Sequence, residues 1–542
     1  MGIFLSPGVF VKEKDISDIV PRVASASAAL VGYSTKGSVD DIILVTNDQQ
    51  FISEYGEPDP STGHYFHYAA LAYLAKGNTL YCLRVMNGAL YGGVNIVKSD
   101  SGDSNASFIV GRSSSALDIA SGDDDEVLFQ IMGANPGVWN NKIGIEVSNI
   151  KDGTAVDATD QYTFEIAVYY QNDDGIYEHV ETWKVSRKER KLDGYGRDLY
   201  LEDKINGVSK YIIVADNTAL ADTILPKEQD DRLDIASGSD GTTDNLDMVS
   251  GWTNFENPDN IDVRLLINGG ESVKDTQTEM LRIAEARADC MAILDMPYSA
   301  LSSVSTMVSW RGGAETHNFN SNYCALYAPW GQVYDPHNDK LVYVPLSGHV
   351  AAQIAYNDYV ANPWDAPAGL NRGRLDIIAL SNVFTEGERN TLYQTQINPI
   401  QMFRGQGIVI WGQKTEQTKS SALSSINVRR LLIVIEKSIA ISLRSFVFEP
   451  NSEITRFRIE SMLKEYMDRL SAQGAFQTEG GDRGYHVLCD ETNNTPASID
   501  KGELNVDVFI KPIRAAEYIK LQAIITSSGA SFEELIARGV MF

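Results

Sequence analysis

The sequence predicts a multidomain protein of mixed α/β (α+β) class, with a β-rich domain inserted between two α/β segments. Residues 21–97 and 251–370 alternate strand and helix patterns, whereas residues 98–250 contain short alternating runs between Ser, Asp and Gly turns. The chain has 542 residues and is 43% hydrophobic. It can therefore bury a substantial core, and it exceeds the length of one ordinary domain.

The N-terminal segment begins with a short strand pattern and continues in a β-α-β rhythm. Val9, Phe10 and Val11 follow Pro7-Gly8 and predict a strand in a free arm over residues 1–20. The pattern then predicts strands at 28–33 and 42–45, a helix at 65–75 and a strand at 79–85.

The middle segment, 98–250, carries most of the acidic excess. The chain has 46 Lys and Arg against 73 Asp and Glu, a net charge of -27, and 30 acidic against 14 basic residues lie between Lys98 and Ser250. Such a charge repels phosphate backbones, so we expect no nucleic-acid partner. The run Asp123 to Glu126 lacks the spacing and central Gly of a calcium loop, and we interpret it as a solvated loop.

After Gly251 the α/β rhythm returns. A strand at 263–267, a helix at 273–288 and a strand at 291–295 predict part of a parallel sheet, because units of this length cross over right-handed. Asp295 ends a strand where α/β enzymes often place a catalytic carboxylate. Neither a dinucleotide loop nor a phosphate-binding loop accompanies it, so we favour a structural carboxylate.

Other candidate chemistry is sparse. Asp358 near His349 could form an acid-base pair, but proximity in sequence does not place both groups in one cleft. His64-x-x-His67 has a spacing that could share a metal, yet no further Cys, His or Glu cluster completes a ligand set. We expect no catalytic, cofactor-binding or metal-binding residues, and no cofactor.

The last third of the sequence has the clearest helical periodicity. Apolar residues at steps of three and four predict a helix at 421–446 with one buried face. Arg430, Lys437 and Arg444 recur every seven residues along another face. They form either a solvated face paired with neighbouring acids or a docking surface for an acidic partner. A second helix follows to Leu470, and strands at 504–510 and 519–525 predict a two-stranded ribbon.

The chain lacks the sequence features of export. Its four cysteines are far apart, with no paired spacing. The N-terminus has no basic region followed by an apolar core, and no apolar stretch approaches the length of a membrane span. We expect a reducing compartment, no direct membrane insertion, and assembly in a cytoplasm.

Three blocks from Pro345 onward combine Pro and Gly turns with bulky aromatic side chains, a composition that specifies backbone geometry and packing. They are Pro345 to Val350 with Asn357-Asp358 and Trp364 to Gly369; Ile397 to Ile400 with Gly407 to Thr415; and Asn427 to Leu431 through Phe448 to Asn451. With the opening Ser6-Pro7-Gly8-Val9, these blocks resemble the contractile phage tail sheath family. The resemblance covers both ends and roughly the last two hundred residues, whereas the acidic middle matches no fixed pattern.

The resemblance implies an assembly domain built from both chain ends, with the variable middle inserted outward. It implies an arm at 1–20, a first α/β part at 21–97, the acidic outer domain at 98–250, a second α/β part at 251–370, a tube-proximal domain at 371–513 and a C-terminal arm at 514–542. The arms of such proteins add strands to neighbours' sheets. The residues expected to exchange strands are Val9, Phe10, Val11, Leu504, Val506, Val508, Ile519 and Leu521.

The resemblance also implies a function. The expected protein is a sheath subunit of the virion tail, assembled in the host cytoplasm, that forms a helical homo-oligomer around an inner tail tube and contracts to drive the tube through the host envelope. Its expected partners are further copies, the tube protein, and baseplate and tail terminator proteins, with Arg430, Lys437 and Arg444 facing the tube. Two alternatives stay open: the sheath of a non-viral contractile injection machine, and an α/β enzyme using Asp295 or Asp358.

Overall fold

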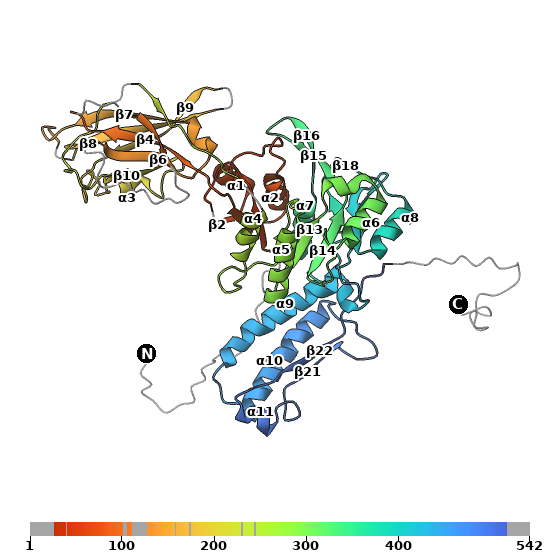
Figure 1. Ribbon diagram of the computed structural model, residues 1–542. Helices are drawn as coiled ribbons and strands as arrows, with labels where there is room; N and C mark the ends of the chain where they lie inside the picture. The colour runs from red at the N-terminus through yellow and green to blue at the C-terminus, as the bar shows by residue number, and fades with distance from the viewer. Residues whose placement is uncertain are drawn as a thin grey trace, which may run out of the picture.

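The computed structural model describes residues 26–39, 41–100, 106–110, 127–157, 159–172, 175–228, 231–242 and 245–517. Figure 1 shows a central α/β domain, a lobe of β-strands at the upper left, and a C-terminal lobe below that is built on two long helices. The mixed α/β class with an inserted β-rich region is therefore confirmed. The predicted strand donors Val9, Phe10, Val11, Ile519 and Leu521 lie outside the described residues.

A nine-stranded sheet forms the centre of the molecule, in the order β17-β20-β19-β14-β13-β12-β1-β3-β2. Its members are β1 (Ala28–Gly32), β2 (Ile42–Val45), β3 (Leu80–Arg84), β12 (Leu265–Ile267), β13 (Met291–Asp295), β14 (Cys324–Ala328), β17 (Arg374–Leu375), β19 (Ile397–Phe403) and β20 (Gly407–Ile410). Six neighbouring strands, from β19 to β3, run parallel. The predicted parallel pairing of 263–267 with 291–295 is confirmed by the β12–β13 pair.

Helices cover both faces of this sheet, as a parallel sheet requires. Residues Ala28 and Leu30 of β1 face one hydrophobic cluster, and Ala29 and Val31 face the other. The first cluster contains residues of α1 (Asp48–Tyr55), α2 (Phe66–Leu74) and α7 (Ser347–Val360). The second contains residues of α4 (Asn245–Thr253), α5 (Lys274–Arg287), α6 (Val304–Gly312) and α8 (Glu386–Gln394).

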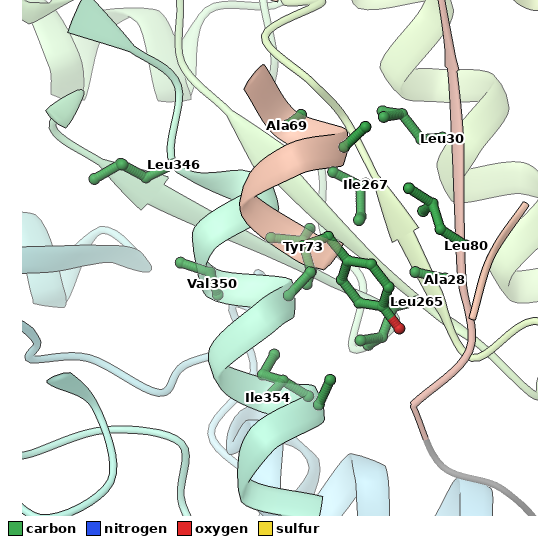
Figure 2. Packing of buried hydrophobic residues seen from close by; sticks show 14 of the residues in the cluster. Ala28, Leu30, Ala69, Tyr73, Leu80, Leu265, Ile267, Leu346, Val350 and Ile354 are labelled. Atoms are coloured by element: carbon green, nitrogen blue, oxygen red, sulfur yellow. The ribbon is translucent and has the colours of Figure 1, made fainter. Parts of the chain in front are cut away.

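Figure 2 shows how α2 and α7 cross over the sheet. Tyr73 of α2 lies against Leu265, and Val350 and Ile354 of α7 belong to the same buried cluster. The helices touch at Gly348, where an added Cβ would lie 2.4 Å from the Ala69 carbonyl oxygen. Glycine in the first of the three sequence blocks is therefore required by the close approach of two backbones.

Shorter elements border the central domain. β15 (Gly331–Asp335), β16 (Lys340–Val344) and β18 (Ala379–Leu380) form a three-stranded sheet. Short 3-10 turns occur at η1 (Val138–Lys142), η2 (Tyr298–Ser302) and η3 (Ala422–Ser424).

The inserted lobe consists of two antiparallel four-stranded sheets around one core. One contains β4 (Tyr91–Val97), β5 (Ala106–Val110), β6 (Val127–Gly133) and β10 (Ile212–Asp216). The other contains β7 (Ile143–Lys151), β8 (Thr163–Gln171), β9 (Tyr177–Val185) and β11 (Leu233–Asp234), with the short helix α3 (Leu201–Ile205) beside β10. Phe129 and Phe164 stack between the sheets with ring centroids 5.4 Å apart.

The junctions of this lobe differ from the predicted boundaries at 98 and 250. β4 already belongs to the lobe, and bridges join Asn87 to Thr242 and Leu90 to Ser239. Helix α4 instead packs in the central core through Met248 and Trp252. We therefore define the inserted lobe as residues 87–242.

The C-terminal lobe begins at α9 (Ile426–Leu443), which continues into η4 (Arg444–Phe446). It continues with α10 (Glu453–Ala472), β21 (Tyr485–Leu488), α11 (Pro496–Asp500) and β22 (Asp507–Ile510). The buried face of α10 consists of Ile459, Met462, Leu463, Tyr466 and Leu470. The helix is capped by Ser452, whose hydroxyl accepts from the Thr455 amide.

One expectation about this lobe needs correction, and another is only partly tested. The predicted strand at 504–510 pairs with β21 through Asp507–Ile510, whereas the predicted strand at 519–525 lies outside the described residues. A separate domain starting at 371 is not seen, because β17, β19 and β20 belong to the central sheet. β17 pairs with β20 although the two strands are far apart in the sequence, and no local pattern in the sequence indicates that pairing.

Candidate interaction surfaces

The three basic residues of α9 and η4 differ in their surroundings. Arg430 is 4% exposed, forms an ion pair with Asp358 of α7, and also donates to the Pro363 carbonyl oxygen at 3.3 Å. The Lys437 ammonium lies 2.6 Å from Asp289, and only 15% of the lysine side chain is exposed. Arg444 lies 3.1 Å from Asp259 with 68% of its side chain exposed.

These contacts join the C-terminal lobe to the central domain. Although burial alone would raise the pKa of the Asp289 carboxyl, hydrogen bonds from Arg287 and Lys437 hold that pKa below its usual value. The prediction that Arg430 faces a partner is wrong, because its guanidinium is buried within the subunit. Lys437 is mostly covered, and Arg444 remains accessible.

The predicted donor strand has a place within its own subunit. Val508 pairs with Val487 of β21, and Leu504, Val506, Val508 and Ile510 pack against the core of the C-terminal lobe. In the described part of the chain, the β21–β22 sheet has only these two strands. An isolated two-stranded sheet is marginally stable, and its outer edges leave backbone groups unpaired. Residues 504–510 are therefore built into the C-terminal lobe of their own subunit.

The enzyme alternative rested on two carboxylates, and both are used structurally. Asp295 is 1% exposed and accepts from the amides of Ser347, at 2.9 Å, and Gly270, at 3.1 Å. It thus holds the N-terminus of α7 against the loop after β12. Burial raises the pKa of Asp295 to about 6, despite these hydrogen bonds. Asp358 is occupied by Arg430.

The histidines also have structural surroundings. His67 is buried with its ring 3.1 Å from the Tyr55 carbonyl oxygen, whereas His64 lies 3.6 Å from Glu271. Burial lowers the pKa of both His67 and His349 to about 4. Among the residues that the structure describes, no group of three or more His, Cys, Asp and Glu side chains could hold a metal ion.

The central domain also contains a buried polar cluster that was not predicted from the sequence. Glu416, fully buried, accepts from His317 at 2.7 Å and lies 3.5 Å from Arg311 and 3.2 Å from the Cys324 sulfur. The other ring nitrogen of His317 lies 2.9 Å from Gln277. The partners come from segments about a hundred residues apart, and the cluster fixes the chain after β20 to the central core.

Arg84 makes a second joint, between the central sheet and the inserted lobe. Its buried guanidinium donates to the carbonyl oxygens of Ser34, at 2.6 Å, and Pro136, at 2.8 Å. Burial lowers the pKa of Arg84 to about 10. On the same junction, Asp240 accepts from the Val138 amide at 2.8 Å.

No helix among the described residues is long and apolar enough to span a membrane.

Comparison with known proteins identifies relatives for most of the chain. The model of the phage tail sheath protein central domain matches residues 241–416, and that of the phage tail sheath C-terminal domain matches residues 418–526. The tail sheath protein of Enterobacteria phage T4 is 31% identical over 392 residues, covering 68% of this chain and 57% of that protein. The chain thus spans little more than half the length of this curated relative.

Solved structures share the fold. The sheath tail protein from Desulfitobacterium hafniense aligns with a TM-score of 0.56 at 12% identity, covering 89% of this chain and 94% of that one. The sheath of an extracellular contractile injection system in its contracted state aligns with a TM-score of 0.53 at 15% identity. The alignment covers 98% of this chain and 100% of that one. Two matching domain models, a curated relative and this fold together place the chain in the contractile phage tail sheath family.

Proposed function

We propose that this chain is the structural subunit of a contractile tail sheath, which polymerises helically around an inner tail tube and contracts to drive that tube through the host envelope. The main support is that the two sheath models match residues 241–416 and 418–526, which include most of the central domain and the C-terminal lobe. The proposed partners are further copies, the tube protein, and baseplate and tail terminator proteins. The subunit is assembled in the host cytoplasm and resides in the virion tail.

The link between copies is strand addition on the β21–β22 sheet. The two outer edges of this sheet accept strands from two other copies. One copy supplies Val9, Phe10 and Val11 of its N-terminal arm, and the other supplies Ile519 and Leu521 of its C-terminal arm. Among the described residues β21 and β22 form a sheet of two strands, which supports a sheet that other segments complete. Backbone hydrogen bonds of this kind survive while near-rigid subunits rotate during contraction.

Contact with the tube involves Arg444, because it is the exposed member of the three basic residues. Its ion pair with Asp259 is solvent-exposed, and such pairs contribute little stability. Exchanging Asp259 for an acidic group on the tube therefore costs little free energy.

The proposed role is mechanical and not enzymatic. The energy of contraction is stored in contacts between subunits, which requires no nucleotide or cofactor. The commitment of Asp295 and Asp358 to internal contacts supports this view over an α/β enzyme. A non-viral injection machine would use the same fold, but the curated relative named above is a phage protein.

Electron microscopy of the purified full chain at high concentration tests the proposal. We expect hollow, helically striated tubes or sheath-like rings. A truncation lacking residues 1–14 serves as the matched control and should give only dispersed particles. Uniform small particles from the full chain, even after addition of tube and baseplate proteins, would refute the proposed function.

A further inference from the structure

The edge of the central sheet at β17 carries a groove whose charge is unusual for this chain. The groove has a volume of about 470 Å³ and lies between β17 and the turn that joins β19 to β20. Its lining includes the apolar side chains of Ile378, which is 53% exposed, Met402 and Phe403. Arg374 and Arg404 line it as well.

The two arginines are uncompensated. Both are exposed, and among the described residues neither forms a hydrogen bond or ion pair with a carboxylate. The one acidic residue named in the lining, Asp376, is paired with Lys76 at 3.0 Å. In a chain of net charge -27, a groove with two free guanidinium groups therefore attracts an acidic surface.

The largest acidic excess in the sequence belongs to the inserted lobe. Residues 87–242 include 28 acidic and 14 basic residues, whereas the segment from Ser421 to the C-terminus has 16 and 14. Carboxylates such as Glu165, Glu178 and Asp203 project from its strands and helix without an ion pair in the described structure.

The topology separates these two features. The chain leaves the sheet for the inserted lobe after β3, next to the β2 edge, whereas the groove lies at the opposite edge. Figure 1 shows the lobe on the far left and β18, which follows β17 closely in sequence, on the other side of the central domain. A subunit with unlike surfaces at opposite ends binds its copies head to tail, and such heterologous contacts produce open helical polymers unless the ring closes.

We propose that the Arg374–Arg404 groove binds the acidic inserted lobe of a second copy. The proposal rests on the proposed sheath function and extends it, because it assigns a contact between copies that is separate from strand addition by the arms. Once the lobe of a second copy covers the groove, the apolar lining keeps water away from the two guanidinium groups, which strengthens their interaction with carboxylates. The contact selects one polarity of packing, since two grooves or two acidic lobes repel each other.

Charge reversal in the full chain tests this contact. Arg374→Glu with Arg404→Glu should raise the critical concentration for polymerisation on the order of tenfold, and the wild-type critical concentration should rise with salt. Lys419→Glu with Lys501→Glu is the matched control, because both lysines are exposed and the net charge changes equally. The control should shift the critical concentration by less than about twofold.

Cross-linking identifies the occupant of the groove. Arg404 is replaced by the photoreactive residue p-benzoylphenylalanine, and polymers are formed from a mixture of isotope-labelled and unlabelled chains. Mixed-isotope cross-links within residues 87–242 would support the proposal. Cross-links to any other segment, or to the same copy, would overturn it.

The outcomes separate this inference from the proposed function. Wild-type tubes together with equal critical concentrations for the groove and control variants would refute the groove and leave the sheath function intact. A wild-type chain that never polymerises, with or without tube protein, would refute both.

Discussion

Replacing Arg430 with methionine should loosen α9 from the central domain. The Arg430 and Asp358 side chains are 5% and 3% exposed, and Asp358 Oδ1 has no hydrogen-bond partner among the described residues. Methionine fills much of the same space but removes the cation, so an isolated carboxylate stays buried. Removing one partner of a buried pair costs about 3–5 kcal/mol.

Hydrogen exchange followed by mass spectrometry measures this cost locally. A chain with several domains does not unfold in one transition, so a single unfolding free energy would be poorly defined. Peptides from Ile426–Leu443 report the opening of α9 itself. A loss of 3–5 kcal/mol corresponds to exchange that is faster by about two to four orders of magnitude.

Two variants make the result interpretable. Arg444→Met breaks an exposed pair and should change exchange by no more than about fivefold. Combining Arg430→Met with Asp358→Leu removes both charges and should restore most of the protection. The reasoning is refuted if Arg430→Met and Arg444→Met give the same small effect, since Arg430 would then behave as a surface residue.

Three further predictions follow from the packing, the buried acid and the arm. Gly348→Ala should lower the local stability of α7 by about 1–3 kcal/mol because its Cβ would press on the Ala69 backbone, whereas Gly387→Ala in open space should not; equal hydrogen exchange of Ser347–Val360 peptides in the two variants would contradict this account. The pKa of Asp295 is raised to about 6, so folding favours its protonated form, and wild type should gain about 2 kcal/mol relative to Asp295→Asn as the pH falls from 7 to 4. Hydrogen exchange of Ser347–Val360 peptides at a series of pH values, compared between the two proteins, measures that gain, and a pH-independent difference would show that the pKa is ordinary. Deleting residues 1–14 should leave a folded monomer that does not polymerise, as judged by circular dichroism and sedimentation, and normal polymers would exclude the arm as a link.

Local patterns predicted the longer helices and several strands of the α/β part of the fold. The spacing of apolar residues placed α5, α9 and α10 and the strands β1, β2, β3, β12 and β13 close to their observed positions. These elements each bury a face over several residues, and that is the feature periodicity detects. No strand was predicted at β4, where Gly92 interrupts the alternation. An added Cβ there would lie 2.7 Å from the Ala236 carbonyl oxygen, so neighbouring backbone requires the glycine.

Contacts between distant segments were not predictable in the same way. The seven-residue repeat of Arg430, Lys437 and Arg444 showed that they share a side of one helix, but not that α7 supplies Asp358 to the first of them. The Glu416–His317 pair was missed for the same reason. Whether a charged side chain is exposed or buried depends on which element packs over it. A single sequence does not show which distant elements pack together.

The position of β1 has a consequence for how the chain folds during synthesis. Ala28 of β1 pairs with Leu265 of β12. Because the inserted lobe lies between these two strands in the sequence, the ribosome must synthesise the whole lobe before β1 can pair with β12. Closing so long a loop is slow, and contacts of high sequence separation form late. The inserted lobe, whose strands pair mainly within residues 87–242, can fold first as the chain emerges. The central sheet then closes after β12 appears, so a ribosome-bound chain lacks the completed central domain, which delays polymerisation until synthesis is nearly finished.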